Sequence, residues 1–117
     1  MKRILLLGGF GFIATNFLDY ISRNCDGNYK VVIFDHFDRH PRGISFNCVE
    51  KVYSGDFNDE LNLNRVCEEN KIDIVLHFLS STVPATSRNA IYDVETNLVS
   101  TLKLLDVMLQ HNVKDIM

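Results

Sequence analysis

The sequence lacks the features that mark a secreted, metal-binding or nucleic-acid-binding protein. Its three cysteines are an odd number and form no Cys-x-x-Cys pair, so we expect no disulfide scaffold and a cytoplasmic, reducing compartment. The four histidines have no ligand spacing with the cysteines or with one another, so we expect no metal site. The net charge is -3, and the longest basic run is Lys2-Arg3. This balance argues against nucleic acid as a partner.

Long apolar runs are also missing. The run that follows Lys2-Arg3 covers only residues 4–7 before glycines interrupt it, and no small-residue cleavage site follows, so we expect no signal peptide. No run approaches the ~20 apolar residues of a membrane span, so no membrane association is expected. With 117 residues, 46% of them hydrophobic and 23% charged, the chain is predicted to be one soluble domain or part of one.

Short apolar runs alternate with helix-period segments along the chain. Strands are predicted at residues 3–7, 30–34, 49–53, 72–78 and 113–117, and helices at residues 12–23, 59–70 and 88–111. This alternation predicts an α/β fold with a doubly wound parallel sheet of about five strands in the order 3-2-1-4-5. Such a sheet does not normally end on its fifth strand, so we expect Met117 to mark a break in a larger protein; an intact small domain is the alternative.

Apolar spacing predicts which face of each helix is buried. The first helix is expected to bury Ile13, Phe17, Tyr20 and Ile21. The second is expected to bury Leu63, Val66 and Cys67, with Asp59 as its N-cap. The third is expected to bury Val94, Leu98, Thr101, Leu102, Leu105, Met108 and Leu109.

The segment GGFGFIA, residues 8–14, lies between the first strand and the first helix. Gly8 allows a tight reversal, and Gly11 allows the backbone to approach a pyrophosphate at the helix N-terminus. Ala14 is the third small residue, where helix and strand pack closely. The segment therefore predicts a dinucleotide site; a strand–helix turn without a ligand is the alternative.

An acidic residue, Asp35, ends the second strand about 20 positions further on, where it can accept hydrogen bonds from an adenosine ribose. A carboxylate there favours NAD and repels the 2′-phosphate of NADP. Arg39, with His36 and His40, is the counter-signal, because these side chains could line a 2′-phosphate pocket. We predict NAD as the cofactor.

Five segments follow one another along the chain: GGFGFIA, VVIFD, SGDFND, DIVLHFLSS and ETNLVSTLKLLD. In this order they resemble the extended short-chain dehydrogenases/reductases. Within that family the chain is most similar to nucleotide-sugar epimerases and dehydratases, and particularly to UDP-glucose 4-epimerase-like members. The resemblance covers essentially all 117 residues. It implies that residues 1–117 are the N-terminal part of an NAD-binding, Rossmann-like domain, without the C-terminal substrate domain.

The resemblance also implies roles for individual residues. Gly8, Gly11, Phe12 and Ile13 match the pyrophosphate turn, although Ala14 stands where the family usually has a third glycine. Asp35 matches the ribose-binding acid. Asp56 and Phe57 match the pair that meets the adenine ring, and Phe78, Leu79 and Ser80 match the nicotinamide side. Thr82 lies where some members touch the cofactor. Asn97 matches an asparagine in the long helix that helps hold the sites around the following strand.

Several of these residues have simpler explanations. Asp56 could simply end the third strand and begin a turn, without any contact to a cofactor. Phe78 and Leu79 could be residues of the hydrophobic core. We expect Asn97 to be a buried amide that needs partners, and His77 to be a satisfied core histidine. The run of hydroxyls at residues 80–82 lacks a G-x-S-x-G elbow, so a nucleophile is not expected there.

The family's catalytic Tyr-x-x-x-Lys pair is absent from these residues, since none of the four tyrosines has Lys four positions later. We therefore assign no catalytic residue. The first hypothesis is the NAD-binding portion of a nucleotide-sugar epimerase or dehydratase that serves polysaccharide or lipopolysaccharide synthesis. The second is a standalone dinucleotide-binding or regulatory module without catalysis. The helix at residues 88–111 resembles one that family dimers use, which predicts a homodimer.

Overall fold

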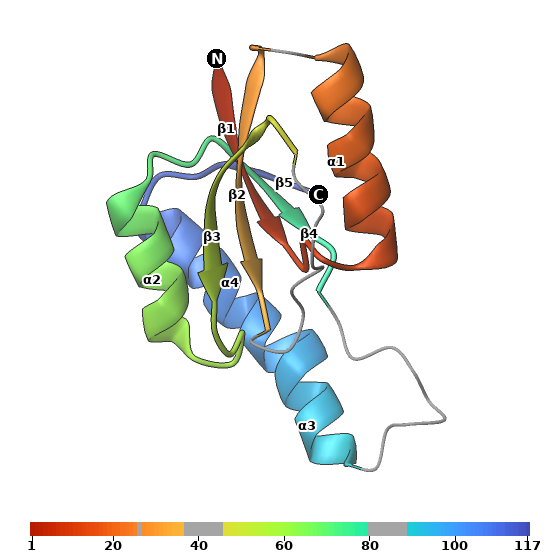
Figure 1. Ribbon diagram of the computed structural model, residues 1–117. Helices are drawn as coiled ribbons and strands as arrows, with labels where there is room; N and C mark the ends of the chain where they lie inside the picture. The colour runs from red at the N-terminus through yellow and green to blue at the C-terminus, as the bar shows by residue number, and fades with distance from the viewer. Residues whose placement is uncertain (26, 37–45, 80–88) are drawn as a thin grey trace.

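The computed structural model describes residues 1–25, 27–36, 46–79 and 89–117. Strands and helices alternate along most of the chain, as the hydrophobic periodicity predicts, although no helix is described between the second and third strands (Figure 1). The elements are β1 (Lys2–Leu7), α1 (Phe12–Asn24), β2 (Tyr29–Asp35), β3 (Val49–Ser54), α2 (Glu60–Glu69), β4 (Ile74–His77), α3 (Ala90–Val94), the π-helical segment η1 (Glu95–Val99), α4 (Ser100–Gln110) and β5 (Asp115–Ile116).

The five strands form one parallel sheet in the order β3-β2-β1-β4-β5. The predicted α/β class and strand order are therefore confirmed. β1 is central, and its register pairs Leu5 with Val32 on one side and with Val75 on the other. Because the strands are parallel, their carboxyl ends meet at one edge of the sheet, where ligands bind in folds of this kind.

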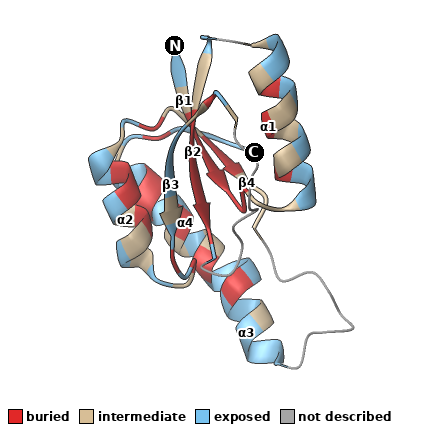
Figure 2. Ribbon diagram, viewed as in Figure 1, coloured by how far each residue is buried: buried red, intermediate tan, exposed pale blue. Residues whose placement is uncertain are grey.

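The core has two halves, one on each face of the sheet, because successive strand side chains point to opposite faces. Leu5 and Leu7 of β1 pack with the buried residues of α2 and α4, whereas Ile4 and Leu6 pack with those of α1. Figure 2 shows that the central strands are buried along most of their length while helix exteriors stay exposed. A strand buried on both faces reads as a continuous apolar run, as β1 does.

The face of α1 that packs on the sheet agrees only in part with the predicted one: Ile21 is buried and Phe17 packs partly buried against the core, as predicted. The buried residues are Ala14, Leu18 and Ile21, whereas Ile13 and Tyr20 are 67% and 62% exposed. The buried face includes Ala14, the small residue next to the glycine turn, which belongs to the same core cluster as Ile4 and Leu6 of β1.

The second helix, α2, agrees with its prediction. It buries Leu63, Val66 and Cys67, and the side chain of Asp59 caps it by accepting a hydrogen bond from Leu61 N at 3.0 Å. This bond uses one of the orphan N–H groups of the first turn.

The predicted long helix is continuous over residues 90–110, but a π-helical turn, η1, lies in its middle. Its predicted face is mostly wrong. The residues buried against the molecule are Thr96, Ser100, Leu104, Val107 and Met108, of which only Met108 was on the predicted stripe. The predicted apolar residues Val94, Leu98, Leu102, Leu105 and Leu109 are between 39% and 77% exposed. The helix thus has a second apolar face, which the described residues leave exposed.

No helix within the described ranges is both long and apolar enough to span a membrane.

Candidate functional site

Three segments of the predicted site meet at the carboxyl edge of β1, β2 and β4. Gly8 follows β1 and donates a hydrogen bond from its N–H to Phe34 O at 2.9 Å. Phe78 follows β4 and donates to Leu7 O at 3.0 Å. Asp35 ends β2. The structure therefore brings the glycine turn, the acidic residue and the end of β4 side by side (Figure 1).

The glycine turn is shaped by different demands at each glycine. Gly8 has a φ of +78°, a left-handed conformation that side chains rarely adopt, and a Cβ there would lie 3.1 Å from the carbonyl of Phe78. A Cβ on Gly9 would lie only 2.4 Å from Ile33 Cγ2. Gly9 was not among the predicted site residues, although its place next to Gly8 is a signal of close approach.

Gly11 is different, because the fold alone does not demand a glycine there. Its φ of -75° and ψ of 169° suit any residue. A Cβ would make one close contact, at 3.2 Å from Gly8 O. Gly11 is the N-cap of α1, yet it has no side chain to accept from the first helical turn. The missing side chain therefore leaves the helix N-terminus open to an anion.

Phe12 and Ile13 begin α1 with their side chains 85% and 67% exposed. Their side chains point away from the core, so what they can offer to a bound phosphate is their backbone N–H. Ala14, in contrast, is 1% exposed and packs against the sheet, as predicted for the third small residue.

Asp35 is buried, with 2% of its surface exposed. Its carboxylate accepts from Phe10 N at 2.9 Å through Oδ2 and from His36 N at 2.7 Å through Oδ1. These bonds fix the carboxylate against the glycine turn. Each carboxylate oxygen has two lone pairs, so both oxygens keep the capacity to accept a ribose hydroxyl.

Asp56 and Phe57 follow β3 and have different environments. Asp56 is exposed, and its Oδ1 accepts from Asn58 N at 2.9 Å. Phe57 is 4% exposed and lies in the core, with its ring 5.1 Å from that of His77. The ring of Phe57 is thus a packing group, and only its backbone is left to meet a cofactor.

At the end of β4, Phe78 and Leu79 are half-buried. The Phe78 ring packs edge-on against Phe17, with centroids 6.4 Å apart. The side chains are therefore core, whereas the backbone of both residues lies against Gly8. Ser80 and Thr82 lie outside the described residues.

Asn97 lies on η1 and is exposed, so the expectation of a buried amide is wrong. The buried polar groups of this helix are its neighbours Thr96 and Ser100, 4% and 1% exposed. The carbonyl of Asn97 accepts from Thr101 Oγ1 at 3.1 Å.

A polar cluster that sequence reasoning missed joins this helix to the turn after β3. Asn58 Nδ2 donates to Thr96 Oγ1 at 3.3 Å, and Ser100 Oγ donates to Asn58 Oδ1. The only available signal was the placement of Thr96 and Ser100, two hydroxyls one helical turn apart, beside apolar positions.

His77 ends β4, and its Nε2 lies 3.0 Å from Thr101 Oγ1. The Thr101 hydroxyl has one proton, which it donates to Asn97 O, so Nε2 must carry a proton and donate to Thr101. Nδ1 is then an acceptor, buried and without a partner among the described residues. Burial lowers the pKa of His77. The expectation of a satisfied core histidine holds for one ring nitrogen only.

The described residues hold no group of three or more His, Cys, Asp or Glu side chains that could bind a metal. What they offer is an open helix N-terminus, a buried carboxylate beside it and a strand end packed on the same turn. These features define the class of proteins with a Rossmann-like dinucleotide-binding βαβ unit.

The family follows from comparison with known proteins. Residues 4–117 match the NAD dependent epimerase/dehydratase family, and the chain belongs to it. The dTDP-D-glucose 4,6-dehydratase of Dictyostelium discoideum is 29% identical over 97% of this chain and 27% of its own length. The UDP-glucose 4-epimerase of Streptococcus mutans is 31% identical over 95% of this chain and 33% of its own length.

Solved structures give the same result. The UDP-glucose 4-epimerase of Bifidobacterium longum, in complex with NAD+ and UDP, is 35% identical, with a TM-score of 0.78 over 98% of this chain and 36% of that one. The UDP-glucose 4-epimerase of Thermotoga maritima with UDP-glucose is 25% identical, with a TM-score of 0.83 over 98% of this chain and 36% of that one. The chain thus spans about a third of the length of the relatives that it matches.

Proposed function

We propose that residues 1–117 are an NAD-binding domain, the N-terminal part of a nucleotide-sugar epimerase or dehydratase of the UDP-glucose 4-epimerase type. The observation that carries the proposal is Gly11. Neither its dihedral angles nor crowding demands a glycine to the extent seen at Gly8 and Gly9. A ligand that approaches the backbone at the N-terminus of α1 explains it.

In this proposal each part of the site meets a different part of NAD. The N–H groups of Phe12 and Ile13 hold the pyrophosphate, since they open α1 behind Gly8 and Gly11. The buried Asp35 accepts from the adenosine ribose. Asp56 and the backbone of Phe57 meet the adenine. The nicotinamide side is formed by Phe78, Leu79 and Ser80. Thr82 and Asn97 are further cofactor-binding positions, of which Asn97 helps hold the sites around the following strand.

When bound, NAD would supply the hydride acceptor for a sugar carbon and the donor for its return, which is the chemistry that such an enzyme needs. This chain's residues bind and orient the cofactor. The acid/base pair and most of the sugar-nucleotide pocket belong to other parts of the enzyme, and UDP-sugars are the proposed substrate class. The proposed role is in polysaccharide or lipopolysaccharide synthesis, and the proposed compartment is the cytoplasm.

Isothermal titration of the chain with NAD and with NADP tests the binding proposal. We expect NAD to bind more tightly than NADP. Gly11→Val should abolish NAD binding, because its side chain fills the space that the pyrophosphate needs. Asp35→Asn should weaken NAD relative to NADP, because it removes the charge that repels a 2′-phosphate. Equal binding of NAD by Gly11→Val and the unaltered chain would overturn the proposal.

A second candidate is a dinucleotide-binding module without catalysis. Both candidates are compatible with the absence of a Tyr-x-x-x-Lys pair from these 117 residues, since the chain spans about a third of the length of its relatives. The reading frame downstream of the Met117 codon distinguishes the two candidates. A Tyr-x-x-x-Lys pair encoded there supports the enzyme, and an immediate stop codon supports the module.

A further inference from the structure

The side chain of Asn58 connects two segments that both belong to the proposed cofactor site. It follows Asp56 and Phe57 in the turn between β3 and α2, whereas its partners Thr96 and Ser100 flank Asn97 on the long helix. Both polar atoms of the amide are used, Nδ2 as donor to Thr96 and Oδ1 as acceptor from Ser100. One side chain therefore sets how these two segments lie relative to each other.

The turn that carries Asn58 is held by its own bonds. Asp56 O accepts from Asp59 N at 3.1 Å and from Asn62 Nδ2 at 3.2 Å, while Asp56 Oδ1 accepts from Asn58 N at 2.9 Å. The backbone of the turn is thereby closed, and the Asn58 side chain is free to face the helix. The Asn58 side chain is therefore attached to a turn whose backbone is held in place.

The helical side of the link is buried, since Thr96 and Ser100 are 4% and 1% exposed. A buried hydroxyl that loses its partner carries a desolvation cost, so the helix would shift if the amide were removed. The link also lies at η1, where the π turn places Ser100 N against Glu95 O. Turns of this kind interrupt α-helices often at functional sites.

A second chain of bonds reaches the same helix from β4. His77 Nε2 donates to Thr101, and Thr101 donates to the carbonyl of Asn97. Asn97 is therefore held between two connections, one to the adenine-side turn and one to the nicotinamide-side strand.

We propose that Asn58 is a positioning residue for the cofactor: through Thr96 and Ser100 it fixes Asn97 relative to the Asp56–Phe57 turn, so that both contact one bound NAD. The proposal rests on the proposed function, because it requires that NAD binds across these segments. Asn58 itself touches no reacting atom.

The experiment is a double-mutant cycle on NAD affinity in the 117-residue chain, measured by isothermal titration. Asn58→Leu removes both bonds at similar size, and Asn97→Ala removes the amide that Asn58 is proposed to place. We expect each single variant to weaken NAD binding by about tenfold, which corresponds to ~1.4 kcal/mol. The double variant should bind NAD only slightly more weakly than either single variant does. Both changes disrupt the same contact, the placement of the Asn97 amide against NAD, so their effects should not add.

Asn70→Leu is the matched control. Asn70 is also a half-buried asparagine that joins α2 to β3, donating to Tyr53 OH at 2.8 Å and to Val66 O at 2.9 Å, but at the other end of α2. It should lower the melting temperature and leave NAD affinity unchanged. Its effect should add to that of Asn97→Ala without coupling, as for independent sites.

Ser100→Ala breaks the link from the other side and keeps a good helix former in α4. It should weaken NAD binding as Asn58→Leu does, even if Asn58→Leu does not fold. Unchanged NAD affinity in Ser100→Ala, or additive effects in the cycle, overturns the positioning role and leaves the proposed function standing. Failure of the unaltered chain to bind NAD overturns the proposal that residues 1–117 bind NAD by themselves, and leaves the family assignment standing.

Discussion

At the scale of single residues, the three glycines of the turn at residues 8–11 are needed for different reasons, two for the fold and one for a bound ligand. Gly8 is needed for its backbone conformation, and Gly9 for the space that Ile33 occupies. Gly11 has an ordinary conformation and one close neighbour. The three glycines look equivalent in the sequence. Substituting each of them should nevertheless have a different effect, on stability at Gly8 and Gly9 and on ligand binding at Gly11.

Gly8→Ala should destabilise the fold more than Gly27→Ala does. Both glycines have a left-handed φ, +78° and +81°, so both substitutions cost roughly 1–2 kcal/mol for the backbone. Only at Gly8 does the new methyl group also meet backbone, the Phe78 carbonyl at 3.1 Å; no described atom lies within 4 Å of a Cβ at Gly27. Urea unfolding of the two variants measures the difference, and equal losses would contradict the crowding argument.

His77 should make the stability of the fold depend on pH. Burial lowers its pKa in the folded chain, whereas the unfolded chain binds a proton at the ordinary value of about 6.5. Below that pH the unfolded state holds more protons, so the free energy of unfolding should fall as the pH is lowered from about 6.5.

His77→Gln should flatten this slope in urea unfolding measured across the range, because glutamine does not titrate. Thr101→Val is the matched control, since it removes the hydrogen bond to His77 but keeps the burial that lowers the pKa. It should reduce stability and leave the slope in place. A slope that survives in His77→Gln would assign the pH dependence to other groups.

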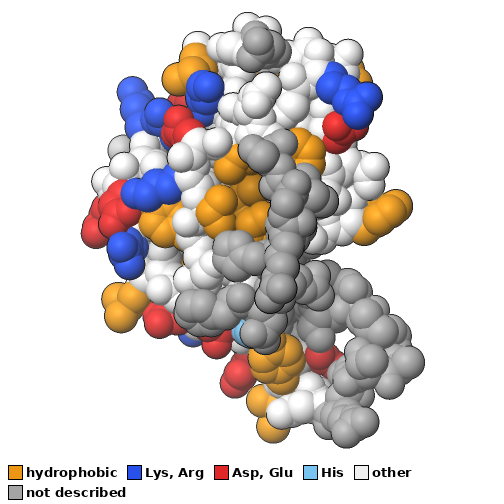
Figure 3. All heavy atoms as spheres, viewed as in Figure 1, with side chains coloured by type: hydrophobic (Ala, Val, Ile, Leu, Met, Phe, Trp, Pro, Cys, Tyr) orange, Lys and Arg blue, Asp and Glu red, His pale blue; other side chains and the backbone are white. Residues whose placement is uncertain are grey.

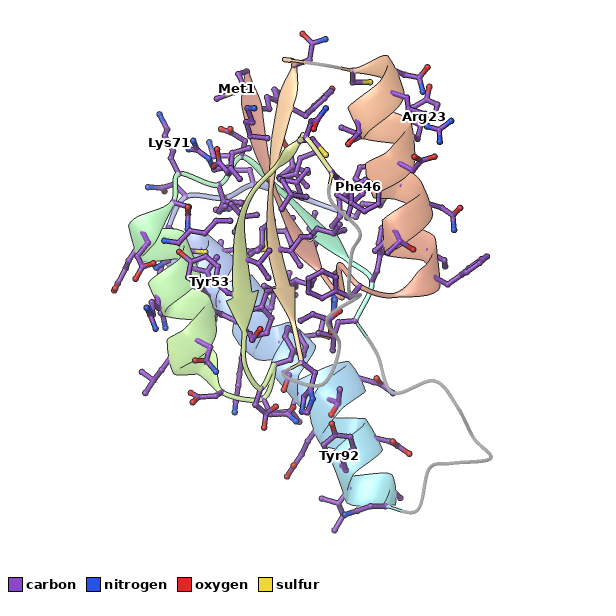
Figure 4. All side chains as sticks on the ribbon, in the orientation of Figure 1. Met1, Arg23, Phe46, Tyr53, Lys71 and Tyr92 are labelled. Carbon is purple, nitrogen blue, oxygen red and sulfur yellow. The ribbon has the colours of Figure 1, made fainter. Side chains whose placement is uncertain are left out.

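At the scale of elements, a charged cluster on the surface joins β3 to α2. Glu69 of α2 accepts from Tyr53 OH at 2.5 Å, from Lys51 Nζ at 3.0 Å and from Arg65 Nε at 2.9 Å. Figure 4 shows Tyr53 reaching from β3 toward α2, and Figure 3 shows acidic and basic side chains gathered over these elements. The bond from Tyr53, then those from Arg65 and Lys51, lower the pKa of Glu69 to about 2.

Glu69→Gln should therefore remove part of the acid dependence of stability. With a folded pKa near 2 and an ordinary value of 4.5, Glu69 stabilises the fold above about pH 4.5, and this contribution is lost as the pH falls toward 2. The cluster is exposed, so salt should weaken the effect. Thermal unfolding between these pH values checks the prediction, with the neighbouring Glu68→Gln as the control for charge. Equal acid sensitivity of the two variants would contradict it.

The elements also show where sequence reasoning succeeds and where it stops. The strands and their order were predictable because runs such as residues 3–7 are apolar on both faces, which parallel strands require. The face of the long helix was not, because apolar periodicity marks Leu98 and Leu102 as readily as Leu104. Nor could residue types indicate the π turn or the Asn58 cluster, since both depend on distances across the fold. At the site, Asp35 and Gly11 were recognisable from spacing, whereas the burial of Phe57 and the exposure of Asn97 were not.

At the scale of the whole molecule, the part of the chain that the structure describes leaves one helix face and two sheet edges uncovered. The described sheet ends at β3 and at β5, two edge strands whose residues are mostly exposed. On α3, η1 and α4, exposed apolar side chains recur at helical spacing: Ile91, Val94, Leu98, Leu102, Leu105 and Leu109. An apolar face of this length indicates a contact with another surface.

We expect that surface to be a second copy of the chain, since the helix at residues 88–111 resembles one that family dimers use. Leu98 and Leu102, 56% and 58% exposed, lie near its middle. Burying each leucine contributes roughly 1.5–3 kcal/mol, so a glutamate at both positions should abolish the dimer. Light scattering at tens of micromolar should give a dimer for the unaltered chain and a monomer for the Leu98→Glu, Leu102→Glu double variant.

Leu61→Glu, at a 75% exposed position on α2, is the control and should stay dimeric. Ile116→Lys on β5 tests the sheet edge instead. A monomeric unaltered chain would overturn the homodimer, and a dimer broken only by Ile116→Lys would move its interface from the helix to the edge of the sheet.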